Sequence, residues 1–303
     1  MRPARPRTQP PGSGGRRRRG RAPLLLLLPA FAVIGVLVLY PLGVSLWDSL
    51  HEDNALVFTH QFVGGRNYSV VLRDPAFLQA GLNTLGYLVV VTAGALLAGL
   101  GMAFWLHNVA RFRAVALAII VLPWAVPGIV TGALWSFIFN PVNGLLNGVL
   151  QGLGVINHPH IWLEGRLTGI FFISLTLIWQ ITPICAVIFL AGLESIPGEL
   201  YEEASVEGAG AFATLRLVTL PLLRPSLAIG LLQASVLAIG IFDQIVVLAG
   251  YAPGSISVVM QLYLYAFRDF NFGVGMAASV IVTLGTLLVS LVYIKGVYRE
   301  VRY

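Results

Sequence analysis

The chain has 303 residues, of which 57% are hydrophobic and 11% are charged, whereas roughly a quarter of the residues of an average soluble domain are charged. So few charged residues cannot cover the apolar surface of a soluble protein of this size. The composition therefore excludes a soluble enzyme, a disordered protein and a disulfide-rich secreted module, and we expect lipid to be the main solvent of this chain.

The first predicted element is an arginine-rich segment at residues 1–22. The net charge of +6 could indicate a nucleic-acid-binding protein, but eight of the 19 basic residues are arginines within this segment. Proline and glycine fill much of the remainder, which predicts disorder. Arginines directly before an apolar helix are typical of a cytoplasmic anchor that faces anionic lipid. We therefore expect a disordered cytoplasmic tail that contacts membrane lipid rather than nucleic acid.

Six apolar segments follow, and each is long enough to cross a bilayer as a helix of about 20 residues. They occupy residues 23–46, 82–106, 114–138, 167–193, 226–249 and 272–294. The first could be a signal peptide, but its uncharged run continues to Asp48 and is too long for a cleavable core. Asp74-Pro75 predicts a short helix before the second segment. The sequence thus predicts an all-α membrane protein, with a six-helix transmembrane domain at residues 23–303.

The distribution of basic residues predicts how these helices are oriented. With the N-terminus inside, the cytoplasmic segments contain 15 lysines and arginines and the outer segments contain 4. Cytoplasmic loops of membrane proteins are enriched in these residues. We therefore expect both termini in the cytoplasm, with the long polar loop at residues 194–225 on the same side.

This cytoplasmic loop has the pattern of a short helix. Pro197 and Gly198 favour a helix start, and the glutamates that follow would lie near the positive end of its dipole. Gly208 and Gly210 predict the end of the helix and allow another backbone to approach closely. These features fit an amphipathic connector at the membrane surface, and they fit a docking element equally well.

The same loop resembles the EAA motif of permease subunits in ATP-binding-cassette (ABC) importers. That motif has the form E-A-A, three residues, G, nine residues, I, one residue, L-P, and every spacing fits. The departures are Glu203 in place of alanine and Val218 in place of isoleucine. The matching residues are Glu202, Glu203, Ala204, Gly208, Val218, Leu220 and Pro221.

Other segments resemble the carbohydrate-uptake, MalF/UgpA/SugA-type permeases of these importers. The run from Leu193 to Glu202 resembles their L-x-x-I-P-x-x-L-Y-E segment. Phe242-Asp243 resembles the start of their F-D-x-x-x-x-L-T-x-G-G-P segment, and Asn83-Thr84 is similar to the start of their second span. The chain is therefore identified as a member of this family.

The resemblance implies a multi-pass protein of the bacterial plasma membrane that imports a sugar or sugar-like solute. Its implied partners are a second permease subunit, two copies of an ATPase and an extracytoplasmic solute-binding lipoprotein. ATP and Mg²⁺ would bind to the ATPase subunits, and this chain would bind no cofactor and catalyse no reaction. The sequence agrees, because its one lysine, Lys295, does not lie in a G-x-x-x-x-G-K-[ST] phosphate loop. The residues implied to couple the permease to the ATPase are Glu202, Glu203, Ala204, Gly208, Leu220 and Pro221.

Polar residues of the fourth and fifth apolar segments are candidates for the solute path, because sugar hydroxyls need hydrogen-bond partners inside an apolar bundle. The resemblance places substrate contacts in the same two segments. The candidates are Trp179, Gln180, Thr182, Gln233, Asp243 and Gln244. They could instead serve packing, with the glutamines bonding between helices. The apolar segments contain no arginine, which favours a neutral solute.

Two other classes of membrane protein compete with this interpretation. A secondary transporter or channel would use ionisable residues within the membrane, and Asp243 is the one candidate. An intramembrane enzyme would need a second acid facing Asp243 or an H-E-x-x-H zinc motif, and His51-Glu52 has no second histidine at that spacing. The sequence therefore predicts no metal site, and a secondary transporter or channel remains the alternative function.

Overall fold

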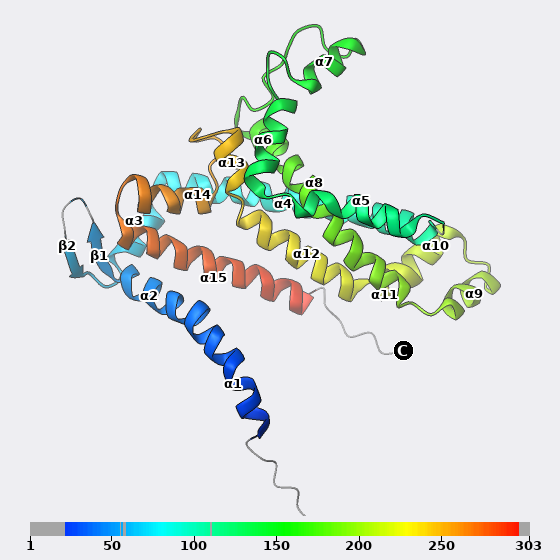
Figure 1. Ribbon diagram of the computed structural model, residues 1–303, viewed down its shortest axis with the longest axis horizontal. Coiled ribbons are helices and arrows are strands. Elements are labelled where there is room, and N and C mark those ends of the chain that lie inside the picture. Colours follow the sequence, from blue (N-terminus) through cyan, green and yellow to red (C-terminus); the bar gives the residue numbers. More distant parts are fainter. Residues whose placement is uncertain (1–21, 55, 57–58, 110, 297–303) are drawn as a thin grey trace, which may run out of the picture. The chain divides into compact units, whose positions relative to one another are not determined.

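A computed structural model describes residues 22–54, 56, 59–109 and 111–296 (Figure 1). The chain divides into two units, residues 1–44 and residues 45–303. The described part of the first unit is helical, with α1 (Ala22–Ile34), the π-helical turn η1 (Gly35–Leu39) and the beginning of α2 (Tyr40–Ser49). The first apolar segment therefore forms the predicted helix. The predicted arginine-rich tail lies outside the described residues, except for Ala22.

The second unit is mainly helical and contains most of the chain. Its long helices are joined by shorter helical segments, two of which are π-helical. After α2 its helices are α3 (Arg66–Arg73), α4 (Pro75–Asn108), α5 (Arg113–Ala125), α6 (Gly128–Ile138), α7 (Leu145–Gly152), α8 (Arg166–Glu194), α9 (Gly198–Val206), α10 (Ala211–Thr214), η2 (Leu215–Thr219), α11 (Leu220–Leu222), α12 (Arg224–Ile239), α13 (Asp243–Leu248), α14 (Val258–Tyr263), η3 (Leu264–Arg268) and α15 (Phe272–Gly296).

A short antiparallel hairpin between α2 and α3 adds β-structure that the all-α prediction did not include. Strand β1 (His51–Asn54) pairs with strand β2 (Thr59–Phe62). The side-chain amide of Asn67 in α3 donates to the carbonyls of Ser49 and His51, at 2.9 and 2.8 Å. These two hydrogen bonds join the base of the hairpin to the helix that follows it.

Four helices in the described part of the chain are long and apolar enough to cross a membrane. Two bent helix pairs, Arg113–Ala125 with Gly128–Ile138 and Ala211–Leu222 with Arg224–Ile239, raise the number of candidate spans to at most six. The four correspond to the first, second, fourth and sixth predicted segments.

One detail of the prediction is wrong: Asp74-Pro75 does not start a separate short helix. Asp74 is the N-cap of α4, because its carboxylate accepts from the backbone N–H of Ala76 at 2.9 Å, and α4 continues without a break to Asn108.

The third predicted segment, 114–138, is not one helix but two, which meet at an angle of 95°. α5 ends at Ala125 and α6 begins at Gly128. The break follows from Pro127, which has no backbone N–H and disfavours a helical conformation in the residue before it. Val126 is accordingly extended, with ψ of 127°.

The fifth predicted segment, 226–249, is also interrupted. α12 ends at Ile239, and α13 begins at Asp243. Non-helical backbone at membrane depth is tolerated where other protein groups satisfy the freed backbone positions. Here the buried hydroxyl of Ser257 donates to the carbonyl of Ile241 at 2.6 Å, which replaces a helical hydrogen bond.

The main core lies where α4, α8 and α12 pack together (Figure 1). The helices approach closely at Gly99 of α4, where an added Cβ would lie 3.0 Å from the Cβ of Cys185 in α8. Cys185 is buried, and its thiol faces the carbonyl of Gly230 in α12 at 3.8 Å. The one cysteine of the chain is therefore a small packing residue. Small residues at such contacts are typical of membrane helices.

Candidate functional site

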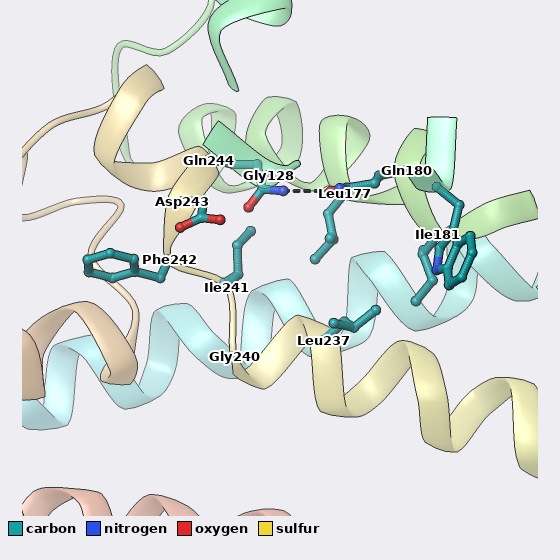
Figure 2. Close-up of a pocket in the computed structure, with 11 residues that line it drawn as sticks. Gly128, Leu177, Gln180, Ile181, Leu237, Gly240, Ile241, Phe242, Asp243 and Gln244 are labelled. Carbon is teal, nitrogen blue, oxygen red and sulfur yellow. Dashed lines mark hydrogen bonds between the residues drawn. The ribbon is translucent and has the colours of Figure 1, made fainter. Parts of the chain in front are cut away.

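The breaks between α5 and α6 and between α12 and α13 both contribute residues to one cavity. The cavity has a volume of about 270 Å³ and receives side chains from α5, α6, α8, α12, α13 and the segment between α12 and α13. Figure 2 shows these residues, which carry both apolar and polar groups. The lining residues are Trp124, Gly128, Leu177, Gln180, Ile181, Leu237, Gly240, Ile241, Phe242, Asp243 and Gln244.

A chain of hydrogen bonds through α8 connects the two breaks. The side-chain N–H of Gln244 in α13 donates to the side-chain oxygen of Gln180 at 2.8 Å (Figure 2). The side-chain N–H of Gln180 in turn donates to the carbonyl of Val126 at 2.6 Å. That carbonyl lies at the end of α5, where Pro127 prevents the usual helical hydrogen bond. Gln180 therefore bonds between helices, as the packing interpretation expected. It also lines the cavity, and these two bonds leave one of its two N–H groups and part of its oxygen's capacity unused.

Asp243 is the one charged residue among these described lining residues. It is partly exposed, and its carboxylate has no hydrogen-bond or ion-pair partner among the described residues. A carboxylate that faces hydrocarbon is costly, so such groups in membrane proteins face a water-filled cavity or a ligand. The geometry at Asp243 therefore provides a hydrogen-bond acceptor for a polar solute.

The cavity contains three of the six residues that the sequence suggested for the solute path, namely Gln180, Asp243 and Gln244. The other three lie elsewhere. Trp179 packs against Trp135, with ring centroids 6.1 Å apart, and the hydroxyl of Thr182 donates to the carbonyl of Ile178 in its own helix at 2.7 Å. Gln233 is exposed on α12 and does not line the cavity.

Sequence reasoning missed the aromatic and glycine residues of the cavity. Trp124 and Phe242 provide rings beside the polar groups, and Gly128 and Gly240 flank the two breaks. Pro127 was the available signal for the first break, and it would have drawn attention to the residues on either side. The side on which each residue lies depends on packing against α8, which the sequence pattern does not reveal.

Replacing Gln180 by leucine is expected to destabilise the second unit. Leucine has a similar size, but it leaves the Val126 carbonyl and the Gln244 amide without these partners, at about 1–3 kcal/mol for each group that stays buried and unpaired. The midpoint of thermal unfolding in detergent measures the effect. Thr283→Val is the control, because Thr283 is exposed on α15 and bonds only within its own helix. Equal midpoints for the two variants would contradict this role of Gln180.

The loop at residues 194–225 forms the predicted short helix. α9 begins directly after Pro197 and ends at Val206. Gly208 follows with φ of 77°, a left-handed conformation that glycine adopts without strain. The N–H of Gly208 bonds to the carbonyl of Ser205 at 3.1 Å, and the N–H of Ala209 bonds to the carbonyl of Ala204 at 2.9 Å. This pair of hydrogen bonds is a Schellman motif, which fixes the end of the helix.

α9 has one face toward its own chain and one toward solvent. Ala204 is buried, and Tyr201 packs against the main core and accepts a hydrogen bond of 3.4 Å from the hydroxyl of Thr219. Glu202 and Glu203 are exposed on the other face. Ala204 therefore helps to seat α9 on the permease rather than lying at its surface. The motif's last two residues, Leu220 and Pro221, are half-buried in α11.

The exposed side of this region also carries large apolar side chains. Val206, Phe212 and Leu217 are 89%, 74% and 72% exposed. Nearby, Arg113 at the start of α5 forms an ion pair with Glu194, which ends α8 and is the first residue of the loop. The region thus combines an apolar surface, the exposed carboxylates of Glu199, Glu202, Glu203 and Glu207, and an ion pair to the helix that carries Gln180.

Comparison with known proteins assigns the chain to a family. Residues 95–295 match the family described as the binding-protein-dependent transport system inner membrane component. The chain belongs to this family. This confirms the resemblance found in the sequence and makes the chain a multi-pass component of the inner membrane, a permease subunit of an ABC transport system.

Similarity to individual relatives covers nearly the whole chain. The trehalose/maltose transport system permease protein MalF of Thermococcus litoralis is 33% identical over 285 residues, which cover 93% of this chain and 96% of the relative. The sulfoquinovosyl glycerol transport system permease protein SmoG of Agrobacterium fabrum is 30% identical over 275 residues, which cover 90% of this chain and 89% of the relative.

A solved structure shares the fold. It is a bacterial alginate ABC transporter, crystallised in complex with an alginate pentasaccharide-bound periplasmic protein. The matching chain superimposes with a TM-score of 0.75 at 19% identity, over 90% of this chain and 93% of that chain. The broken helices around the cavity therefore occur in an ABC permease fold.

Proposed function

We propose that this chain is the permease subunit of an ABC importer that moves a neutral sugar or sugar-like solute, delivered by an extracytoplasmic binding protein, into the cytoplasm. The observation that carries the proposal is the cavity between the two helix breaks, in a chain 33% identical to a trehalose/maltose permease. Membership of a binding-protein-dependent family favours this function over the secondary transporter or channel that Asp243 alone had suggested.

The chemistry of the cavity suits a sugar. Sugar hydroxyls require hydrogen-bond partners when they leave water, and sugar rings present apolar faces to aromatic side chains. The carboxylate of Asp243 accepts hydrogen bonds from sugar hydroxyls, and the amides of Gln180 and Gln244 provide further hydrogen-bonding groups. Trp124 and Phe242 offer apolar ring faces.

The volume of the cavity, about 270 Å³, is below the roughly 300–1,000 Å³ of typical ligand pockets. In this proposal the second permease subunit supplies the remaining wall.

The charge of the lining favours a neutral solute over an anionic one. The described lining contains one carboxylate, at Asp243, and neither lysine nor arginine. An anionic solute would be repelled by Asp243 and would find no cation to pair with. This combination distinguishes trehalose- or maltose-like sugars from phosphorylated or sulfonated ones.

The exposed face of α9 is the proposed docking surface for the ATPase. Glu202, Glu203 and Gly208 lie there, while Ala204, Leu220 and Pro221 hold the loop in place. Two ATPase copies would bind ATP and Mg²⁺, and this chain would bind no cofactor. Movement of α9 would reach the cavity through α8, because α9 follows the end of α8 and Gln180, which lines the cavity, is a residue of α8.

The proposed topology has six spans, both termini in the cytoplasm and α9 on the same side. Single cysteines should reveal it in a Cys185→Ala background. A membrane-impermeant maleimide added to intact cells is expected to label Asn143→Cys, which is exposed in the outer segment, and to spare Ser205→Cys, which is exposed on α9. Both should be labelled after the cells are opened. Labelling of Ser205→Cys in intact cells would invert the topology and remove the docking surface from the ATPase side.

Uptake by whole cells tests the proposed function. Deleting the gene in its own organism should abolish the uptake of at least one radiolabelled neutral disaccharide from a panel that includes trehalose and maltose. The chain supplied from a plasmid should restore it. Unchanged uptake of every neutral sugar, with loss of uptake of an anionic or non-sugar solute, would contradict the proposed substrate class.

A further inference from the structure

The first residue of α6, Gly128, lies against the carboxylate of Asp243 (Figure 2). A Cβ placed on Gly128 would lie 2.5 Å from the Oδ2 atom of Asp243 and 2.9 Å from its Cβ. The contact with Oδ2 could be relieved by rotating the side chain. The contact with Cβ could not, because rotation about the side-chain bonds leaves Cβ in place. Any side chain at residue 128 would therefore displace Asp243 and the start of α13.

A second glycine, one turn further along α6, has a similar contact without reaching the cavity. A Cβ on Gly132 would lie 2.9 Å from the Cβ of Val247 in α13. Gly132 and Val247 are not among the lining residues. Both glycines thus allow α6 to pack closely on α13, but only Gly128 makes its contact with a polar group that lines the cavity.

We infer that Gly128 determines solute selectivity, because it leaves the space in which the Asp243 carboxylate faces the cavity. This inference rests on the proposed function and adds a positioning residue in the third predicted segment to those in the fourth and fifth. The unpaired carboxylate is the independent observation behind it. A site that hydrogen-bonds a particular hydroxyl rejects analogues that lack that hydroxyl, and the rejection depends on where the acceptor lies.

Substitution of Gly128 should change the discrimination between a sugar and its analogues as well as the amount of transport. Gly128→Ala is expected to raise the concentration for half-maximal uptake of the wild-type sugar about tenfold, which corresponds to about 1.4 kcal/mol. It should also reduce the preference for that sugar over its monodeoxy analogues. Gly132→Ala imposes a comparable packing contact on the same helix pair, so it should leave this preference unchanged.

The experiment measures uptake of radiolabelled trehalose or maltose, whichever the wild type transports, in competition with monodeoxy analogues. The complete importer carries each glycine variant with and without Asp243→Ala. Alanine at residue 243 keeps the Cβ that meets residue 128, so the backbone shift persists in the double variant, but no carboxylate is left to be misplaced. The inference therefore predicts that Gly128→Ala has no further effect on discrimination when Asp243→Ala is present. An equal loss of discrimination in both glycine variants would overturn it, and so would an effect of Gly128→Ala that persists without the carboxylate.

Two further measurements distinguish a failure of this inference from a folding defect and from a failure of the proposed function. The amount of each variant in the membrane and its thermal midpoint in detergent are measured alongside uptake. If Gly128→Ala is lost from the membrane while Gly132→Ala is retained, Gly128 serves folding and the inference fails. If the wild-type importer transports neither sugar, the proposed substrate class fails instead.

Discussion

Replacing Asp243 by alanine is expected to raise the concentration for half-maximal sugar uptake about tenfold to a hundredfold. The substitution removes the one carboxylate of the described cavity and leaves a desolvated sugar hydroxyl without its acceptor, which costs about 1–3 kcal/mol. Basal ATP hydrolysis by the complex should remain, because Asp243 makes no described hydrogen bond or ion pair with any residue of the coupling loop. Transport kinetics and ATPase activity of the reconstituted complex measure both effects.

Two companion variants identify what Asp243 contributes. Asp243→Asn keeps a hydrogen-bonding side chain of similar size. If Asp243 acts as a hydrogen-bond acceptor, Asp243→Asn should raise the half-saturation concentration less than Asp243→Ala does. If the charge of Asp243 matters, the two variants should raise it equally. Gln233→Ala removes a polar side chain that is exposed outside the cavity, and it should leave the half-saturation concentration unchanged. Normal kinetics in Asp243→Ala would assign this residue a packing role.

Replacing Gly208 by aspartate is expected to lower solute-stimulated ATP hydrolysis more than tenfold, equivalent to about 1.4 kcal/mol or more of lost docking energy. An added Cβ meets nothing within 4 Å in the chain itself, so space within the permease is not the constraint. The expected loss of coupling follows instead from the left-handed backbone of Gly208 and from its exposed position. A carboxylate there would enter the docking surface beside Glu202 and Glu203.

The chain provides matched controls for this substitution. Gly154 also has a left-handed backbone, with φ of 70°, and open space around it, but it lies in the predicted outer segment. Gly154→Asp should therefore leave coupling intact. Asparagine at residue 208 tolerates the same backbone without the charge. An equal loss in Gly208→Asn would show that a partner approaches too closely for any side chain, and unchanged coupling in Gly208→Asp would remove α9 from the docking surface.

Much of this fold follows from local sequence. Long charge-free runs predicted α4, α8 and α15, because a helix that crosses lipid must satisfy its own backbone hydrogen bonds. Pro197, Gly198 and Gly208 predicted the limits of α9, since proline favours a helix start and a left-handed residue ends one. These signals act within a few residues and need no knowledge of the surroundings.

The cavity could be predicted only in part, because it depends on contacts between distant segments. The breaks near Val126 and Gly240 persist because Gln180 and Ser257 satisfy carbonyls that no longer bond within a helix. Composition alone could not reveal these partners. Trp179 and Gln180 are adjacent in sequence, but successive residues of a helix point about 100° apart, and of this pair Gln180 lines the cavity while Trp179 does not.

The energy source of transport is the most direct test of the central claim that this chain is an ABC importer permease. The complex that copurifies with the tagged chain would be reconstituted into proteoliposomes with its solute-binding protein outside. Our account predicts that trehalose or maltose accumulates only when ATP and Mg²⁺ are enclosed at the α9 side, and that Gly208→Asp abolishes this accumulation. Accumulation driven by an ion gradient without ATP, and unaffected by Gly208→Asp, would contradict the account and favour a secondary transporter.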